Sequence, residues 1–249
     1  MNFNPYFTYN ITGVCMLNIK SKDFLYKDNE SDIVIAIING NSIFKKLSKI
    51  YKLEFYDKNC SKFNLNDNNY IFVNSCNEIY EFITFHKPLI IIFVFDNKNI
   101  RKNLKEIIKL LEINNNLIII NKSNLNLTKL NVPVIKYGNW NKLTNEILKN
   151  SYEKGYLLIK YEQLENEIKK IENYLSKFLN FKNLRILSIL LLKDYENTKN
   201  LILKYLNYDI ENDDNLELMI KKICNKYNDL ELIIENTINF KVEELYKNN

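Results

Sequence analysis

Three short polar loops, each directly after an apolar run, hold residue types that could bind a charged ligand. Residues 40–42 read Gly-Asn-Ser, residues 74–77 read Asn-Ser-Cys-Asn, and residues 121–124 read Asn-Lys-Ser-Asn. Amides, hydroxyls and an ammonium group can hydrogen-bond to phosphate oxygens and to the edge of a nucleobase. The pattern therefore raises the hypothesis of a nucleotide site.

The first loop is compared with the phosphate-binding motif GxxxxGK[ST]. In that motif backbone N–H groups wrap the phosphates, the Lys reaches the β and γ phosphates, and the hydroxyl ligates Mg²⁺. Gly40 and Ser42 match the second Gly and the hydroxyl, whereas Asn41 replaces the Lys. The loop also lacks the first Gly and is about three residues short. Two interpretations stay open. The segment is either a degenerate phosphate loop with Ser42 as the Mg²⁺ ligand, or an ordinary strand-to-helix turn in which Ser42 caps the helix.

The second loop follows an apolar run at the place where GTPases carry DxxG, whose Asp meets Mg²⁺ through water. Here Asn74 and Asn77 stand in place of the Asp and the Gly. Asn74 is therefore a second candidate for the metal site, without the charge of a carboxylate.

The third loop matches the guanine-reading motif NKxD in three of its four positions. Asn121, Lys122 and Ser123 fit the motif, and Asn124 replaces the Asp. A carboxylate accepts from two N–H groups of the base, whereas an amide offers one acceptor and one donor. We expect the substitution to cost a charge-assisted pair and to weaken the reading of guanine.

Composition excludes several classes of protein. The chain has 249 residues, a net charge of +5 without a dense basic run, and a single histidine, His86. Its four cysteines show no CxxC spacing, which argues against a metal site or a disulfide framework. There is no apolar run of membrane-spanning length and no secretory pattern at the N-terminus, so the expected location is the cytoplasm without a membrane partner.

The apolar pattern changes once along the chain. Up to about residue 150, buried-type strands alternate with amphipathic helices, which predicts a mainly parallel sheet covered on both faces. The predicted strands are 32–38, 52–57, 68–74, 87–96, 117–121 and 132–138, and the predicted helices between them are 42–51, 99–115 and 141–150. After that only helices are expected, packed as a bundle, over 161–179, 183–206 and 214–238. The predicted domains are 1–30, an N-terminal remnant; 31–150; and 151–249, with Gly155 as the hinge.

The run 87–150 resembles the second half of the GTPase domain of the TrmE-Era type GTPases, in particular the tRNA modification GTPases of the MnmE type. In that family a strand ending in LVLD, a helix, NKSDL and the segment VIRISAK follow one another. Residues 94–96, 121–123 and 134–135 fall in register with these segments, and 137–139 read Tyr-Gly-Asn in place of SAK.

The likeness extends into the helical region, where residues 213–226 are similar to the family's C-terminal segment. Cys224 then corresponds to the family's C-terminal cysteine and is the one catalytic candidate, while the tail after Lys226 has no counterpart. The resemblance implies a three-layer P-loop GTPase-like α/β domain with a mainly parallel sheet, followed by an α-helical bundle. The first thirty residues are too few for the family's folate-binding domain, so the folate site is not expected.

The family's activity implies GTP, Mg²⁺ and K⁺ as cofactors, bound through Gly40, Asn41, Ser42, Asn121, Lys122 and Asn124. It also implies modification of the wobble uridine of tRNA, of the 5-carboxymethylaminomethyl type, together with a MnmG-like FAD protein, and a homodimer. Because the Lys of the phosphate loop, the Asp and Gly of DxxG and the Asp of NKxD are missing, GTP hydrolysis is expected to be weakened or lost.

Two alternatives stay open. Residues 32–59 also mimic the strand, Gly turn and helix of a degenerate NAD(P)-binding Rossmann protein, loosely like 6-phosphogluconate dehydrogenase, with Asp57 ending the next strand. The other alternative is a non-catalytic interaction module. Sheet topology separates the first from the GTPase, because an antiparallel strand beside the first parallel pair favours the GTPase and the parallel order 3-2-1-4-5-6 favours the dehydrogenase.

Overall fold

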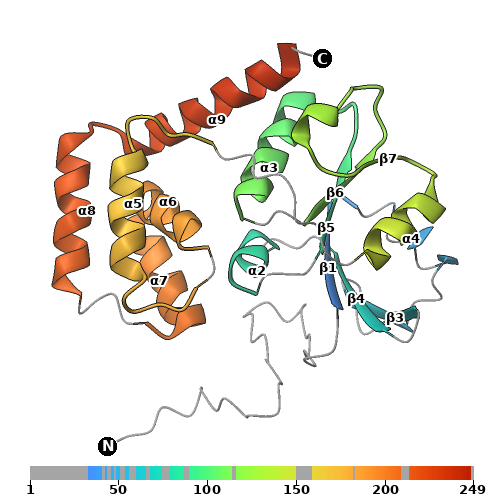
Figure 1. Ribbon diagram of the computed structural model, residues 1–249, viewed down its shortest axis with the longest axis horizontal. Helices are drawn as coiled ribbons and strands as arrows, with labels where there is room; N and C mark the ends of the chain where they lie inside the picture. Colours follow the sequence, from blue (N-terminus) through green and yellow to red (C-terminus); the bar gives the residue numbers. More distant parts are fainter. Residues whose placement is uncertain are drawn as a thin grey trace, which may run out of the picture. The chain divides into compact units, whose positions relative to one another are not determined.

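A computed structural model gives the arrangement of most of the chain (Figure 1). The residues that it describes are 33–40, 43, 46–47, 49–50, 54–55, 60–65, 68–74, 79–86, 90–113, 116–149, 159–181, 183–208 and 213–247. The predicted N-terminal remnant 1–30 and the predicted hinge at Gly155 lie outside them. The described residues form two compact units. The sheet unit holds residues 33–95, 116–122 and 133–149, and the helical unit holds 96–113, 123–132 and 159–247.

The sheet unit is built on seven strands in the order β2-β3-β4-β1-β5-β6-β7. The strands from β4 to β7 in that order run parallel, while β3 is antiparallel to both β2 and β4. Their bounds are β1 Ile33–Ile38, β2 Glu54–Phe55, β3 Cys60–Leu65, β4 Asn68–Asn74, β5 Ile90–Phe95, β6 Leu117–Asn121 and β7 Val134–Lys136.

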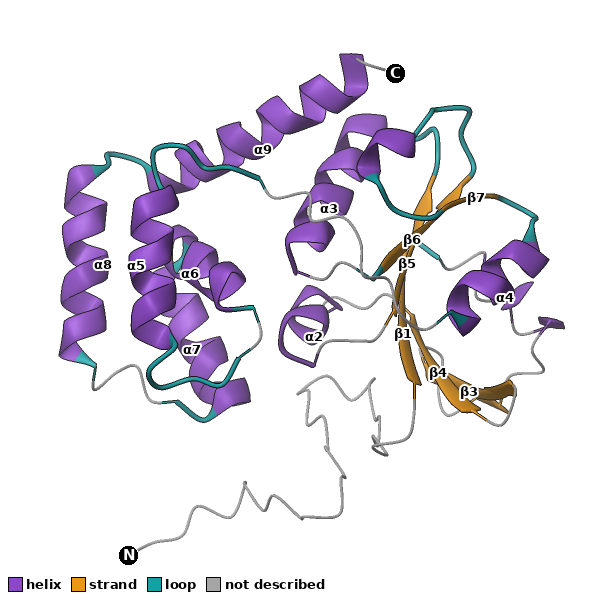
Figure 2. Ribbon diagram, in the orientation of Figure 1, coloured by secondary structure: helices purple, strands orange, loops and turns teal. Residues whose placement is uncertain are grey.

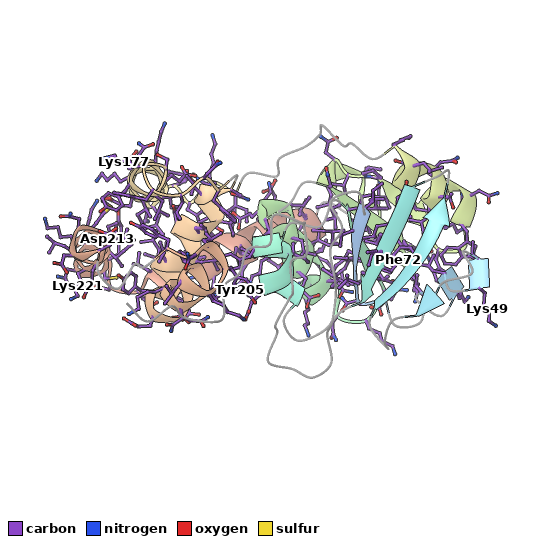
Figure 3. The ribbon with its side chains drawn as sticks, turned by 90° about the horizontal axis from the view of Figure 1, so that it is seen from below. Lys49, Phe72, Lys177, Tyr205, Asp213 and Lys221 are labelled. Carbon is purple, nitrogen blue, oxygen red and sulfur yellow. The ribbon has the colours of Figure 1, made fainter. Side chains whose placement is uncertain are left out.

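The central strands are parallel because both of their faces are apolar. Every residue of β5 and of β6 is buried, as expected for strands with helices on both sides. In the sheet unit, α2 (Ile79–His86) and α4 (Trp140–Leu148) lie on opposite faces of the sheet (Figure 2). One core cluster joins the strands to the buried Leu143 and Ile147 of α4, and Phe72, labelled in Figure 3, belongs to it. The predicted three-layer α/β fold is confirmed.

Two elements of the sheet unit were not predicted from the sequence. These are α2 and the antiparallel strand β3, which pairs with β4 from Cys60↔Val73 to Leu65↔Asn68. The antiparallel β3 next to the parallel pair β4 and β1 is the topology expected for the GTPase. The dehydrogenase alternative, which needed an all-parallel order, is not favoured.

The described residues of the helical unit form five helices after residue 159, together with α3, which follows β5 in the chain. Their bounds are α3 Ile100–Ile113, α5 Glu165–Leu175, α6 Leu184–Lys193, α7 Tyr195–Leu206, α8 Asp214–Lys226 and α9 Leu230–Lys247. A short 3₁₀ turn, η1, spans Thr128–Leu130. Helix α9 packs on α3 and α6, and α5 packs on α6 and α8.

The prediction of three long helices in this region was wrong, because two of them are interrupted. Asp194 ends α6 and caps α7, and its carboxylate accepts from the backbone N–H of Asn197 at 3.2 Å. Asp229 precedes α9 and accepts from the backbone N–H of Leu232 at 2.9 Å. A carboxylate at a helix start satisfies an unpaired N–H group, so each Asp begins a new helix inside an unbroken apolar pattern.

Charged groups join α9 to its neighbours within the helical unit. Glu235 of α9 accepts from Lys105, Lys109 and Lys193 at 2.5, 3.0 and 2.7 Å. Among the described residues, no helix is both long enough and apolar enough to span a bilayer.

Candidate functional site

The turn after β1 holds the first predicted site residue, Gly40. Asn39 adopts a left-handed conformation with φ 57°, and Gly40 is buried. A Cβ at position 40 would lie 2.1 Å from Cγ2 of Ile37, so any side chain there would collide with the strand. The backbone N–H of Ile43 donates to the Gly40 carbonyl at 2.8 Å. The glycine is thus required by a tight return of the chain onto its own strand.

The remaining predicted residues of the first two loops are described only in part. Asn41 and Ser42 lie outside the described residues. Asn74 ends β4, with its backbone in register with Ile37 of β1, and its side chain is not among those described. Within the described residues no three His, Cys, Asp or Glu side chains gather as metal ligands do.

The third loop ties the ends of three parallel strands together. The backbone N–H of Lys122 donates to the carbonyl of Phe95 at 2.8 Å, and the N–H of Tyr137 donates to the carbonyl of Asn121 at 2.9 Å. These bonds bring the carboxyl ends of β5, β6 and β7 to one place, where parallel α/β sheets bind their ligands.

Beyond Lys122 the third loop turns away in a short hydrogen-bonded turn. The Ser123 hydroxyl accepts from the N–H of Leu125 at 3.0 Å, and Asn124 is exposed. Cys224 is an exposed cysteine on α8 of the helical unit. The catalytic and binding roles of these residues stay predictions.

Tyr137 is a residue of this edge that the sequence analysis did not single out. The Nζ atoms of Lys46 and Lys122 each lie over its ring, 4.8 Å from the ring centroid. Trp140 meets the same ring edge-on, with centroids 5.5 Å apart and an interplanar angle of 76°. The available signal was the replacement of the SAK segment by Tyr-Gly-Asn, which places an aromatic ring after the last strand.

The two residues after Tyr137 have structural roles in starting α4. Gly138 has φ 95°, a conformation that L-residues with side chains rarely adopt. Asn139 caps α4, and its side chain accepts from the N–H of Lys142 at 3.2 Å. The turn therefore links Tyr137 directly to the start of α4.

Asp96, at the end of β5, is used within the turn that starts α3. Its Oδ1 accepts from the N–H of Lys98 at 2.9 Å and from Nδ2 of Asn103 at 3.2 Å. Asn103 is buried and donates also to the carbonyl of Lys98 at 3.0 Å. The carboxylate of Asp96 therefore stabilises the turn that begins α3, which belongs to the helical unit.

The residues present do not fit a tightly held GTP·Mg²⁺ complex. In the predicted motif assignment, the three positions where such a site carries a Lys and two Asp hold the amides Asn41, Asn74 and Asn124. An amide brings no charge to a phosphate or to Mg²⁺, a cation that prefers carboxylate and phosphate oxygens. In addition, Lys122 already lies over the aromatic ring of Tyr137.

No protein-family model and no curated protein matches the chain. Among solved structures the matches have the fold of a P-loop GTPase, in agreement with the sheet order described above. Specifically, the chain is similar to cytosolic domains of the iron transporter FeoB. The apo domain from T. maritima has 16% identity and a TM-score of 0.62, with 88% of this chain and 99% of that domain covered.

Two further FeoB structures give the same picture. The domain from S. thermophilus bound to mGMPPNP has 15% identity and a TM-score of 0.64, covering 86% of this chain and 96% of that one. The domain from L. pneumophila has 12% identity and a TM-score of 0.61, covering 86% and 98%. A second structure of the S. thermophilus FeoB domain is bound to GDP.AlF4- and K+.

These matches correct the resemblance to MnmE, which was wrong. The likeness to the FeoB domain includes parts of both the sheet unit and the helical unit, since it covers 88% of this chain. Most of the segments that suggested MnmE lie in the α/β part that P-loop GTPases share, and the similarity of residues 213–226 to the family's C-terminal segment did not identify the family either. The roles in tRNA modification and with a MnmG-like protein rested on that resemblance alone, and the comparisons do not support them.

Proposed function

We propose that the chain is a non-hydrolysing protein of the P-loop GTPase fold class, with weak affinity for guanine nucleotides, that acts as an interaction module. The observation that carries the proposal is the set of amides Asn41, Asn74 and Asn124 at the three charged positions of a GTP site. The fold is kept, including the helical unit, while the charges that hold and activate GTP are not.

The loss of charge translates into a large loss of affinity. A hydrogen bond to a charged group contributes about 1.5 to 3 kcal/mol, so three such losses amount to roughly 6 kcal/mol. Since about 1.4 kcal/mol is a factor of ten, a site of about micromolar Kd would weaken to about 10 mM or beyond.

Hydrolysis depends even more strongly on the missing groups. In phosphoryl transfer the Lys and the metal ion neutralise charge that develops on the phosphate oxygens, and this electrostatic stabilisation provides most of the catalysis. A S. thermophilus FeoB domain is bound to GDP.AlF4- and K+. In this chain we expect neither K⁺ nor Mg²⁺ to stimulate phosphate release.

The test uses the full chain and two readouts. Trp140 is the only tryptophan of the sequence and lies next to Tyr137, so its fluorescence reports binding at this edge. Titration with GTP, GDP and ATP should give no saturation below about 1 mM, and phosphate release from GTP with Mg²⁺ and K⁺ should stay at the rate without protein. Micromolar binding of GTP, or release stimulated by Mg²⁺, would overturn the proposal.

A restored variant makes the test sharper. The triple variant Asn41→Lys, Asn74→Asp, Asn124→Asp returns the charges and should bind GTP more tightly than the wild-type chain. Asn126→Asp is the matched control, because it makes the same change in the same loop and can keep the hydrogen bond to the N–H of Thr128. An equal gain in the control would mean that general charge, and not the motif, sets the affinity.

Location and assembly belong to the same proposal. The similar structures are cytosolic domains, which supports a cytoplasmic location for this chain. The predicted homodimer stays a prediction, which sedimentation of the full chain would test.

A further inference from the structure

Tyr137 stands at the junction of three segments of the sheet unit. It follows β7, and its backbone N–H donates to the carbonyl of Asn121 at the end of β6. The Nζ atom of Lys122, the residue after Asn121, lies over its ring. Lys46, from the helical residues after β1, lies over the ring at the same distance of 4.8 Å. One aromatic ring thus interacts with two ammonium groups from two different segments of the chain.

The contact with Lys122 has a specific chemical meaning. In a base-reading NKxD loop the Lys covers the ring of the purine. A purine and a phenol both present an aromatic face, and an ammonium group is attracted to such a face by the ring quadrupole. In this chain the ring over which Lys122 lies is the chain's own Tyr137.

We infer that Tyr137 is the residue that excludes purine nucleotides from this edge of the sheet, by providing within the chain the aromatic partner that Lys122 would otherwise find in a base. A nucleotide that enters must displace Lys122 from Tyr137 and give the ring a new position. The contact with Lys46 opposes such a movement, because the ring is also held from the segment after β1. This inference deepens the proposed weak nucleotide binding and rests on it.

A purely structural role for Tyr137 makes a different prediction. Tyr137 and Trp140 pack against the core of the sheet unit, so loss of the ring also removes packing. If packing were its whole role, substitution would lower stability and leave nucleotide affinity unchanged or weaker. An excluding residue must instead give tighter nucleotide binding when its ring is removed.

The test compares Tyr137→Leu with Tyr137→Phe in the full chain. Leu keeps apolar packing and has no aromatic face, whereas Phe keeps the face and loses only the hydroxyl. We expect Leu to bind GDP about five- to tenfold more tightly than the wild-type chain, which is about 1 to 1.4 kcal/mol, and Phe to bind as the wild-type chain does. Trp140 fluorescence and calorimetry with GDP as the probe measure the affinities.

Tyr205→Leu is the matched control. Tyr205 of α7 has Lys204 over its ring at 4.4 Å, in the helical unit, so the same change removes a lysine–tyrosine contact elsewhere. Thermal unfolding of all variants separates folding from binding. If Tyr137→Leu does not fold, the NMR shifts of the Lys122 side chain decide instead, since the ring current of Tyr137 should displace them and added GDP should reduce that displacement.

The outcomes separate the two proposals. Equal GDP affinity of the wild-type chain, Tyr137→Leu and Tyr137→Phe, all in the millimolar range, overturns the role of Tyr137 and leaves the proposed function intact. Micromolar binding by the wild-type chain overturns the proposed function. Lys122 resonances without a ring-current displacement overturn the inference in either case.

Discussion

Glu112 of α3, in the helical unit, carries a pH-dependent prediction. Its Oε2 accepts from the hydroxyl of Tyr161 at 2.9 Å, while its buried Oε1 has no hydrogen-bond partner among the described residues. Burial raises the pKa of Glu112 from 4.5 to about 7, although the Tyr161 hydrogen bond and the charge of Arg185 act in the opposite direction. The folded chain therefore holds a proton that the unfolded chain releases.

The sign of the pH dependence follows from this difference. The stabilisation is fully present below pH 4.5, and it is lost as the pH rises to about 7. At about 1.4 kcal/mol per pKa unit, the rise from 4.5 to about 7 corresponds to about 3 kcal/mol of unfolding free energy.

Substitution of Glu112 by Gln should remove this loss. The amide does not ionise, and its carbonyl oxygen can still accept from Tyr161. At pH 8 we expect Glu112→Gln to be about 2 to 3 kcal/mol more stable than the wild-type chain, which corresponds to a Tm higher by roughly 4 to 12 °C.

Urea unfolding followed by far-UV circular dichroism, at several pH values from 4 to 8, measures the effect. The control variant Glu162→Gln removes an exposed carboxylate of the same helical unit and accounts for the loss of a charge as such. A difference in unfolding free energy between Glu112→Gln and the wild-type chain that is the same at pH 4 and at pH 8 would refute the reasoning.

Three further predictions concern other single residues. Despite burial, hydrogen bonds from three lysines lower the pKa of Glu235 to about 2. The ionised Glu235 therefore stabilises the folded chain above pH 4.5, and this stabilisation is lost as the pH falls toward 2. In urea unfolding, Glu235→Gln should lower the unfolding free energy by about 1 to 2 kcal/mol at pH 7 and by less at pH 3. Gly40→Ala places a Cβ 2.1 Å from Ile37 and should cost about 1 to 3 kcal/mol by the same measurement, with an unchanged stability counting against the tight turn. Asp194→Ala removes the cap of α7 and should cost about 1 kcal/mol, while Asp194→Asn should retain most of the stability.

Local pattern was enough to predict six of the seven strands of the sheet unit and its helix α4. The run 117–121 is apolar on both faces, and the structure places β6 there as a fully buried parallel strand. The long apolar run 183–206 was wrongly predicted to be one helix. The helix boundary inside it depends on one capping carboxylate, that of Asp194, and not on the periodicity. Strand β3 was missed because its partner β4 defines it, and that pairing is a contact between segments.

The family was misjudged for a related reason. The segments around Asp96, Asn121 and Val134 occur at the same places in many GTPases, since they follow the strands of one shared sheet. They predict the class of fold and do not separate its branches. The likeness to the FeoB cytosolic domain came from comparing whole structures, in matches that cover 88% and 86% of this chain.

The sequence by itself determined which charges are present, and therefore that Asn41, Asn74 and Asn124 cannot serve as the Lys and Asp residues of a GTP site. That conclusion needs only the chemistry of the side chains. Only the tertiary structure decided what Lys122 does in their absence, because its aromatic partner Tyr137 is fifteen residues further along the chain and the contact with Lys46 joins separate segments. Such contacts arise when parallel strands bring their ends together, and no local pattern encodes them.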